Sequence, residues 1–114
     1  MSTTQEFMLF FRLKPMLTKP STEEIERMQQ TWGAYLGGLA SQQKLVSTTR
    51  IGFQGKQILA NGQVIEGMLL SNELTLSGTL IVKAKDFSEA EDIAKLSPVL
   101  ADGGSVEIRT TIPM

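Results

Sequence analysis

The carboxylate of Glu66 is the side chain in this sequence best placed for acid–base chemistry. It lies between Ile65 and Met68, and apolar surroundings raise the pKa of a carboxyl group, which prepares it to donate or accept a proton. The alternative is a carboxylate at a strand end, in solvent or paired with an arginine. Glu66 is therefore a candidate catalytic residue, and the alternative is that its carboxylate has only a structural role.

Two arginines occur on segments that are otherwise rich in apolar residues. Arg12 and Arg50 could hold a carboxylate or phenolate if both side chains point into one cavity, because a guanidinium can bind such anions through two parallel hydrogen bonds. They could equally be ion-pair partners or residues at the rim of a site. If both guanidinium groups do point into one cavity, we expect a small anionic or aromatic ligand there.

Three other side chains complete the candidate ligand-binding set. Tyr35 borders the apolar stripe of a predicted helix, so its hydroxyl could face a cleft. Asn72 and Glu73 offer, with Glu66, oxygen atoms that suit a hard cation, but their spacing alone predicts no metal site. Residues 102–105, D-G-G-S, could form an anion-binding nest, but they precede a strand rather than a helix, which favours a turn.

The chain contains no histidine and no cysteine. This excludes disulfides, thiolate zinc sites, thiol nucleophiles and every mechanism with a histidine base. The net charge of −1 argues against a nucleic-acid partner, although Arg12, Arg50 and Arg109 could form a local basic patch. We therefore expect no metal, no cofactor and no nucleic acid.

The length of 114 residues suits one domain over residues 1–114. No charged segment precedes an apolar stretch at the N-terminus, and no apolar run approaches the roughly 20 residues of a membrane span. We expect a soluble cytoplasmic protein without a membrane partner.

The predicted strand over residues 6–13 carries large apolar side chains on both faces. Phe7 and Leu9 alternate with Met8 and Phe10, and alternate side chains of a strand point to opposite faces. Helices on one side of the sheet would leave one of these faces in water. A second copy of the chain is the simplest cover for it.

Two helices are predicted between the strands. Ser21 and Glu24 form a capping box for the first helix, whose glycines at positions 33, 37 and 38 indicate either close packing or fraying after Leu36. The second helix begins with Asp86 or with Ser88 as its N-cap and ends before Pro98. The apolar stripe of the first helix comprises Ile25, Met28, Trp32, Leu36 and Leu39.

The remaining segments are predicted as strands, a hairpin and a loop. Asn61-Gly62 favours a type I′ turn within a hairpin over residues 54–66, and residues 67–77 are expected to be an irregular loop. Further strands are predicted at 45–53, 78–84 and 105–112.

This order predicts an α+β fold of the ferredoxin-like type. It is a βαββαβ antiparallel sheet with two helices on one face and an inserted β-hairpin. Two such sheets that pair face to face would form a dimeric α+β barrel. RNA-recognition modules share this order, but their third strand carries aromatic residues, and residues 78–83 contain none, so we reject an RNA-binding function.

Several strings resemble the YCII-related family, and within it the branch with a D-G-P-F motif. N-G-Q-V-I-E-G-M-L at 61–69 stands where that branch has its hairpin and motif. G-T-L-I-V at 78–82 matches a family strand, and D-F-S-E-A at 86–90 is similar to the helix start D-L-D-E-A. G-G-S-V-E-I-R at 103–109 is close to the family's G-G-S-V-E-V-R ending.

The resemblance implies the same fold, a homodimer through the sheet faces, and a pocket near the hairpin and the sheet edge. Glu66 stands at the position of the motif aspartate, and only Gly67 of the motif is identical. The histidine–aspartate pair of YCII proteins cannot be carried over, because the chain has no histidine.

We therefore expect a YCII-related small-molecule-binding protein. Its enzymatic form would be a metal-independent proton transfer on a small polar-aromatic or lactone-like substrate, with Glu66 as acid or base and Arg12 or Arg50 as the anion clamp. The alternative is a non-catalytic dimeric regulatory or scaffolding module whose pocket is empty or closed by methionines 8, 28 and 68.

Overall fold

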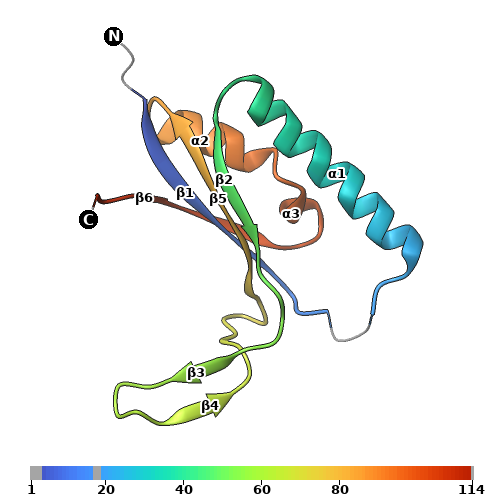
Figure 1. Ribbon diagram of the computed structural model, residues 1–114, viewed down its shortest axis with the longest axis vertical. Helices are drawn as coiled ribbons and strands as arrows, with labels where there is room; N and C mark the ends of the chain where they lie inside the picture. The colour runs from blue at the N-terminus through green and yellow to red at the C-terminus, as the bar shows by residue number, and fades with distance from the viewer. Residues whose placement is uncertain (1–3, 17–18, 114) are drawn as a thin grey trace.

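The computed structural model describes residues 4–16 and 19–113 of the chain. It is a mixed α+β structure with one four-stranded sheet, one two-stranded hairpin and three helices (Figure 1). The strands are β1 (Gln5–Leu13), β2 (Leu45–Arg50), β3 (Lys56–Ile58), β4 (Val64–Glu66), β5 (Thr75–Ala84) and β6 (Ser105–Thr110). The helices are α1 (Thr22–Ser41), α2 (Phe87–Lys95) and α3 (Pro98–Ala101).

The main sheet has the strand order β2-β5-β1-β6, and each neighbouring pair is antiparallel. The predicted α+β class with an antiparallel sheet is thus confirmed. The two central strands are also the longest, with 10 and 9 residues. Helix α2 ends at Lys95, before Pro98 as predicted, and Pro98 begins α3, where a missing backbone N–H costs nothing.

The core lies between one face of this sheet and the helices. Phe7 and Leu9 are fully buried, whereas Met8 and Phe10, which alternate with them, are only partly buried. Leu39, Ile93 and other helix residues pack against the buried face. The second face of the sheet, which we call the open face, has no helix over it within the described chain.

Helix α1 begins where the sequence predicts. The Ser21 hydroxyl accepts a hydrogen bond from the backbone N–H of Glu24 at 3.1 Å, which satisfies one of the donors left free at a helix start. The helix continues to Ser41, so the alternative that it frays after Leu36 is wrong. A Cβ at Gly33 would meet nothing within 4 Å, and the same holds at positions 37 and 38, so close packing against the described residues does not explain these glycines.

Helix α2 uses the first of its two possible caps. The Asp86 carboxylate accepts a hydrogen bond from the N–H of Glu89 at 2.9 Å, and the helix starts at Phe87. Ser88 consequently lies in the first turn and does not act as the cap.

The predicted hairpin is present as β3 and β4, but its turn is not type I′. Gly62 has a φ of +88°, whereas Asn61 does not have a positive φ, and a type I′ turn needs one at both positions. The N–H of Gly62 donates to the carbonyl of Leu59 at 2.8 Å, and the N–H of Gln63 donates to the Asn61 side chain at 2.9 Å. This pattern is typical of a three-residue loop that ends in a glycine bulge.

Residues 67–77 are more regular than the sequence predicts. Ser71 and Leu74 form a bridge across a tight turn, in which Asn72 and Glu73 have φ values of +53° and +67°. Strand β5 follows at once, three residues earlier than the predicted strand over 78–84. Asparagine tolerates this backbone conformation better than most residues, which gives the turn a local cause.

A tight turn precedes β6, as predicted for residues 102–105. The N–H groups of Gly103 and Gly104 donate to the carbonyls of Leu100 and Val99 at 3.2 and 2.9 Å, so neither is available to an anion. A Cβ at Gly104 would overlap the carbonyl oxygen of Arg12. Glycine is therefore required at this position.

The hairpin extends away from the rest of the chain (Figure 1). The radius of gyration is 15.7 Å, against about 13 Å for a compact domain of this length. The chain is thus more extended than a fully packed domain. Among the described residues, no helix is long and apolar enough to cross a membrane.

Candidate functional site

A groove of about 570 Å³ lies between α1, the end of β1 and α3. Its volume falls within the roughly 300–1,000 Å³ of small-molecule sites. Both apolar and charged side chains line it, and they come from segments far apart in the sequence. The lining residues are Leu13, Lys14, Met16, Glu24, Arg27, Met28, Thr31, Trp32, Pro98, Ala101 and Asp102.

The indole of Trp32 is the aromatic part of this groove. Its ring meets the ring of Phe11 edge to face, with the centroids 5.2 Å apart, and that of Tyr35 at 5.8 Å. Such contacts stabilise both rings beyond their burial. Trp32 packs at the edge of the core, where the apolar stripe predicts it, and it is only partly buried, so it also offers a flat surface to the groove.

Arg27 supplies the groove with a positive charge. It is exposed on α1, and within the described part of the chain no carboxylate lies within ion-pair distance of its guanidinium. Lys14, by contrast, pairs with Glu73 at 3.6 Å. Glu24 and Asp102 line the same groove. The groove therefore combines hydrogen-bond donors, carboxylate acceptors and an aromatic surface.

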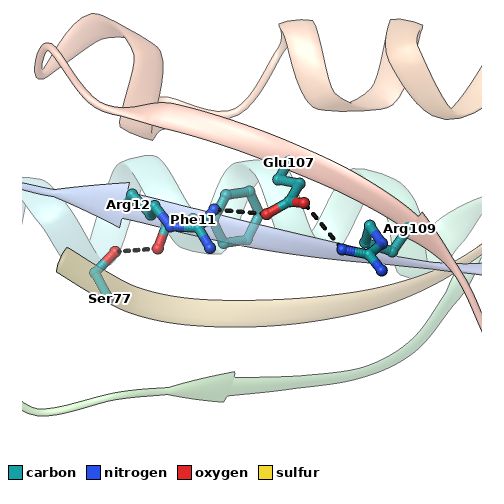
Figure 2. A network of polar contacts seen from close by, with 5 residues as sticks. All are labelled: Phe11, Arg12, Ser77, Glu107 and Arg109. Carbon is teal, nitrogen blue, oxygen red and sulfur yellow. Dashed lines mark hydrogen bonds and ion pairs between the residues drawn. The ribbon is translucent and has the colours of Figure 1, made fainter. Parts of the chain in front are cut away.

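Arg12 lies elsewhere, on the open face of the sheet. Its guanidinium donates to Glu107 at 2.9 Å, and Arg109 donates to the other oxygen of that carboxylate at 3.2 Å (Figure 2). The hydrogen bond from Arg12, followed by that from Arg109, holds the pKa of Glu107 below its ordinary value of 4.5. Figure 2 also shows the Ser77 hydroxyl, which donates to the carbonyl of Phe11 at 3.1 Å and links β5 to β1.

Arg12 and Arg50 do not converge. Arg50 pairs with Gly78, which pairs in turn with Phe11, and directly opposed residues of neighbouring strands point to the same face. Arg50 therefore lies on the helix side of the sheet, at an edge strand, and Arg12 lies on the open side. A joint anion clamp does not form in this arrangement.

Glu66 lies outside the groove, on the hairpin. Its side chain is 79% exposed, and one carboxylate oxygen is 3.3 Å from the ammonium of Lys56. The described residues do not provide the predicted apolar surroundings. The arrangement matches the structural alternative, a strand-end carboxylate in solvent, except that its partner is a lysine.

Tyr35 lines a second groove, of about 710 Å³, between α1 and α2. Its hydroxyl does not point freely into that groove, because it donates to the carbonyl of Ile93 at 2.8 Å. Burial raises its pKa from 10.0 to about 12. The phenol therefore stays neutral at physiological pH and ties α1 to α2.

Asn72 and Glu73 do not meet Glu66 in a cation site. They form the tight turn between Ser71 and Leu74, where their positive φ values have a structural cause. Within residues 4–16 and 19–113, no group of three or more acidic residues is arranged to hold a metal ion.

Sequence reasoning did not identify Arg27 or Lys14, considered Asp102 only within the turn or anion nest at 102–105, and assigned Trp32 to the core alone. One signal was present in the first helix. Glu24, Arg27 and Thr31 recur at steps of three and four beside the apolar stripe, which places them in one row on the helix surface. The contribution of α3 to the same groove has no local signal.

The comparisons with known proteins add no relative. No protein-family model matches this chain, and no curated protein matches it. The geometry of the groove is consequently the basis for a functional assignment.

Proposed function

We propose that this chain is a dimeric, cytoplasmic small-molecule-binding protein related to the YCII family. Its ligand is a small polar-aromatic carboxylate, and its site is the groove between α1, β1 and α3. The observation that carries the proposal is one groove that holds the guanidinium of Arg27, which has no carboxylate partner among the described residues, and the half-buried indole of Trp32.

Each chemical feature of this ligand has a counterpart in the groove. A guanidinium can bind a carboxylate through two hydrogen bonds. The ring face of Trp32 and the thioether of Met28 can pack against an aromatic ring. Glu24 and Asp102 can accept hydrogen bonds from a hydroxyl or amino substituent on that ring. Because the lining carries both signs of charge, a ligand with both acceptor and donor groups fits better than a simple anion.

The strand order supports the fold part of the proposal. Without the hairpin strands, the order β6-β1-β5-β2 becomes 4-1-3-2 in chain order, with all neighbours antiparallel, which is the ferredoxin-like arrangement. The hairpin is inserted between β2 and β5, as in the family described above. Pairing of two open faces would cover Met8 and Phe10.

Catalysis is not part of the proposal. The exposed carboxylate of Glu66 is paired with Lys56, and it does not line the groove. The alternative of a pocket closed by methionines also lacks support. Of the three, only Met28 lines the groove, whereas Met8 lies on the open face of the sheet and Met68 beside Gly55.

Ligand binding can be measured directly, because Trp32 is the only tryptophan of the chain. Its fluorescence should change saturably with 4-hydroxybenzoate or 4-aminobenzoate, and much less with the neutral methyl ester of either. Arg27→Gln should weaken binding of the carboxylates roughly tenfold to a hundredfold, the usual value of a hydrogen bond between charged groups. Calorimetry on the same samples would exclude optical artefacts.

Arg50→Gln is the matched control, since Arg50 is also an exposed arginine but lies outside the groove. It should leave the affinity unchanged. The proposed site would be wrong if both substitutions weakened binding equally, or if neither carboxylate bound to the native protein.

A further inference from the structure

The projecting segment over residues 54–70, which we call the arm, exposes several large apolar side chains. It contains β3 and β4, and these two strands pair only with each other in the described sheets. An isolated two-stranded hairpin is marginally stable in water. Four large aliphatic side chains of the arm are more than half exposed: Ile58 (74%), Val64 (52%), Leu69 (70%) and Leu70 (51%).

One face of the arm has the composition of a contact surface. Ile58 lies opposite Val64, and Lys56 lies opposite Glu66, so all four side chains point to the same side of the hairpin. The apolar pair is thus flanked by an ion pair with a nitrogen–oxygen distance of 3.3 Å. An apolar centre with a charged rim is typical of protein interfaces.

The open face of the main sheet has the same pattern. Met8, Phe10 and Ile81 share this face by register, and Glu107 with its two arginines lies beside them (Figure 2). The chain therefore carries two apolar surfaces, each with charges of both signs; no helix of the described chain lies over either, although Met8, Phe10 and Ile81 are partly buried by their neighbours. In a two-fold dimer the same surface of each copy takes part in the interface. A second copy of the chain can therefore cover both the open face and the arm.

The arm enlarges the area that the open face offers to a second copy. The four strands of 6 to 10 residues project an area of about 500 Å² at the usual rise and strand spacing, and the exposed side chains of the arm add to it. The arm lies between the end of β2 and the start of β5 (Figure 1). It therefore adds apolar area next to the main sheet.

We propose that the arm of one copy packs against the second copy, with Ile58 and Val64 buried in the contact. This inference rests on the dimer proposed above and adds the element that completes it. It also accounts for the large radius of gyration, because a segment that is held by a partner need not pack against its own chain.

Light scattering of the native protein and of Ile58→Asp, across a tenfold dilution, tests this inference. A charge buried without a partner opposes association strongly, so we expect the dissociation constant of Ile58→Asp to rise at least about tenfold. Ile112→Asp is the matched control, since Ile112 is 83% exposed and lies outside the arm; it should dimerise as the native protein does. Circular dichroism would establish that both variants are folded.

Hydrogen exchange of the native arm is a second readout that needs no substitution. We expect the backbone N–H groups of β3 and β4 to exchange faster on dilution, as the dimer dissociates. A dimer that is unaffected by Ile58→Asp, with exchange independent of concentration, would overturn the role of the arm and leave the sheet-face dimer in place. A native monomer would overturn both, and ligand binding in the groove would stand independently.

Discussion

The surroundings of an arginine determine whether it is available to a ligand. Arg12 lies on a strand beside aromatic residues, which made it a candidate anion clamp, but its guanidinium is already bound to Glu107 at 2.9 Å. Arg27, on an exposed helix face, has no such partner in the described chain and lines the groove. The sequence could not distinguish the two, because residue 107 is 95 positions from Arg12.

Tyr35 provides the clearest test of the packing between α1 and α2. Its pKa is raised from 10.0 to about 12, which means that the folded state favours the neutral phenol. The corresponding stabilisation is complete below pH 10 and is lost as the pH rises from 10 through 12. Because Tyr35 is the only tyrosine of the chain, the absorbance of its phenolate reports this titration alone.

We expect a midpoint near pH 12 in the folded protein and near pH 10 in denaturant. Circular dichroism at each pH would show that the fold persists during the titration. A midpoint near pH 10 in the folded protein would mean that the phenol is solvated and that its hydrogen bond to Ile93 is not maintained.

At the scale of elements, the sequence allows either Asp86 or Ser88 as the N-cap of α2, and the structure distinguishes between them. The Asp86 carboxylate bonds to the N–H of Glu89 at 2.9 Å, whereas Ser88 lies inside the helix. Asp86→Ala should therefore lower the free energy of unfolding by about 1 kcal/mol. Ser88→Ala should change it by less than about 0.5 kcal/mol, the usual range for an exposed surface position.

Chemical denaturation of the two variants would measure both effects. The opposite order, with the larger loss for Ser88→Ala, would place the start of α2 two residues later than in this structure.

Elements with a local cause could be predicted from the sequence. The run of apolar residues that includes Phe7 and Leu9 predicts the central strand, and the Ser21 cap predicts the start of α1. For α2 the sequence leaves two possible caps, Asp86 and Ser88. The hairpin was predicted, but the type of its turn was not, since Asn61-Gly62 is compatible with both a two-residue and a three-residue loop.

The groove could not be predicted in the same way. Its walls come from β1, α1 and α3, and α3 itself was missing from the prediction because Pro98 was interpreted only as a helix terminator. The predicted site at Glu66 depended on two apolar neighbours in the sequence. In the structure Ile65 lies on the hairpin, Met68 follows it, and the Glu66 side chain is 79% exposed, so sequence proximity did not produce an apolar pocket.

At the scale of the whole molecule, the described chain has two surfaces that the proposed second copy would cover. The main sheet is covered on one face only, and the hairpin has no cover within the described chain. The groove, by contrast, is formed entirely by one copy, on the helix side of the sheet. Association through the open face and the arm would therefore leave the groove accessible to a ligand.

The central claim is that this groove is the ligand site, and a map of backbone amide chemical shifts tests it most directly. We would record the NMR spectrum of the native protein as 4-hydroxybenzoate is added. We predict saturable shifts concentrated at Arg27, Trp32 and Ala101, on the two walls of the groove. The claim would be contradicted by shifts centred on Tyr35 in the second groove or on Glu107 at the open face. It would also be contradicted if 4-hydroxybenzoate caused no shifts.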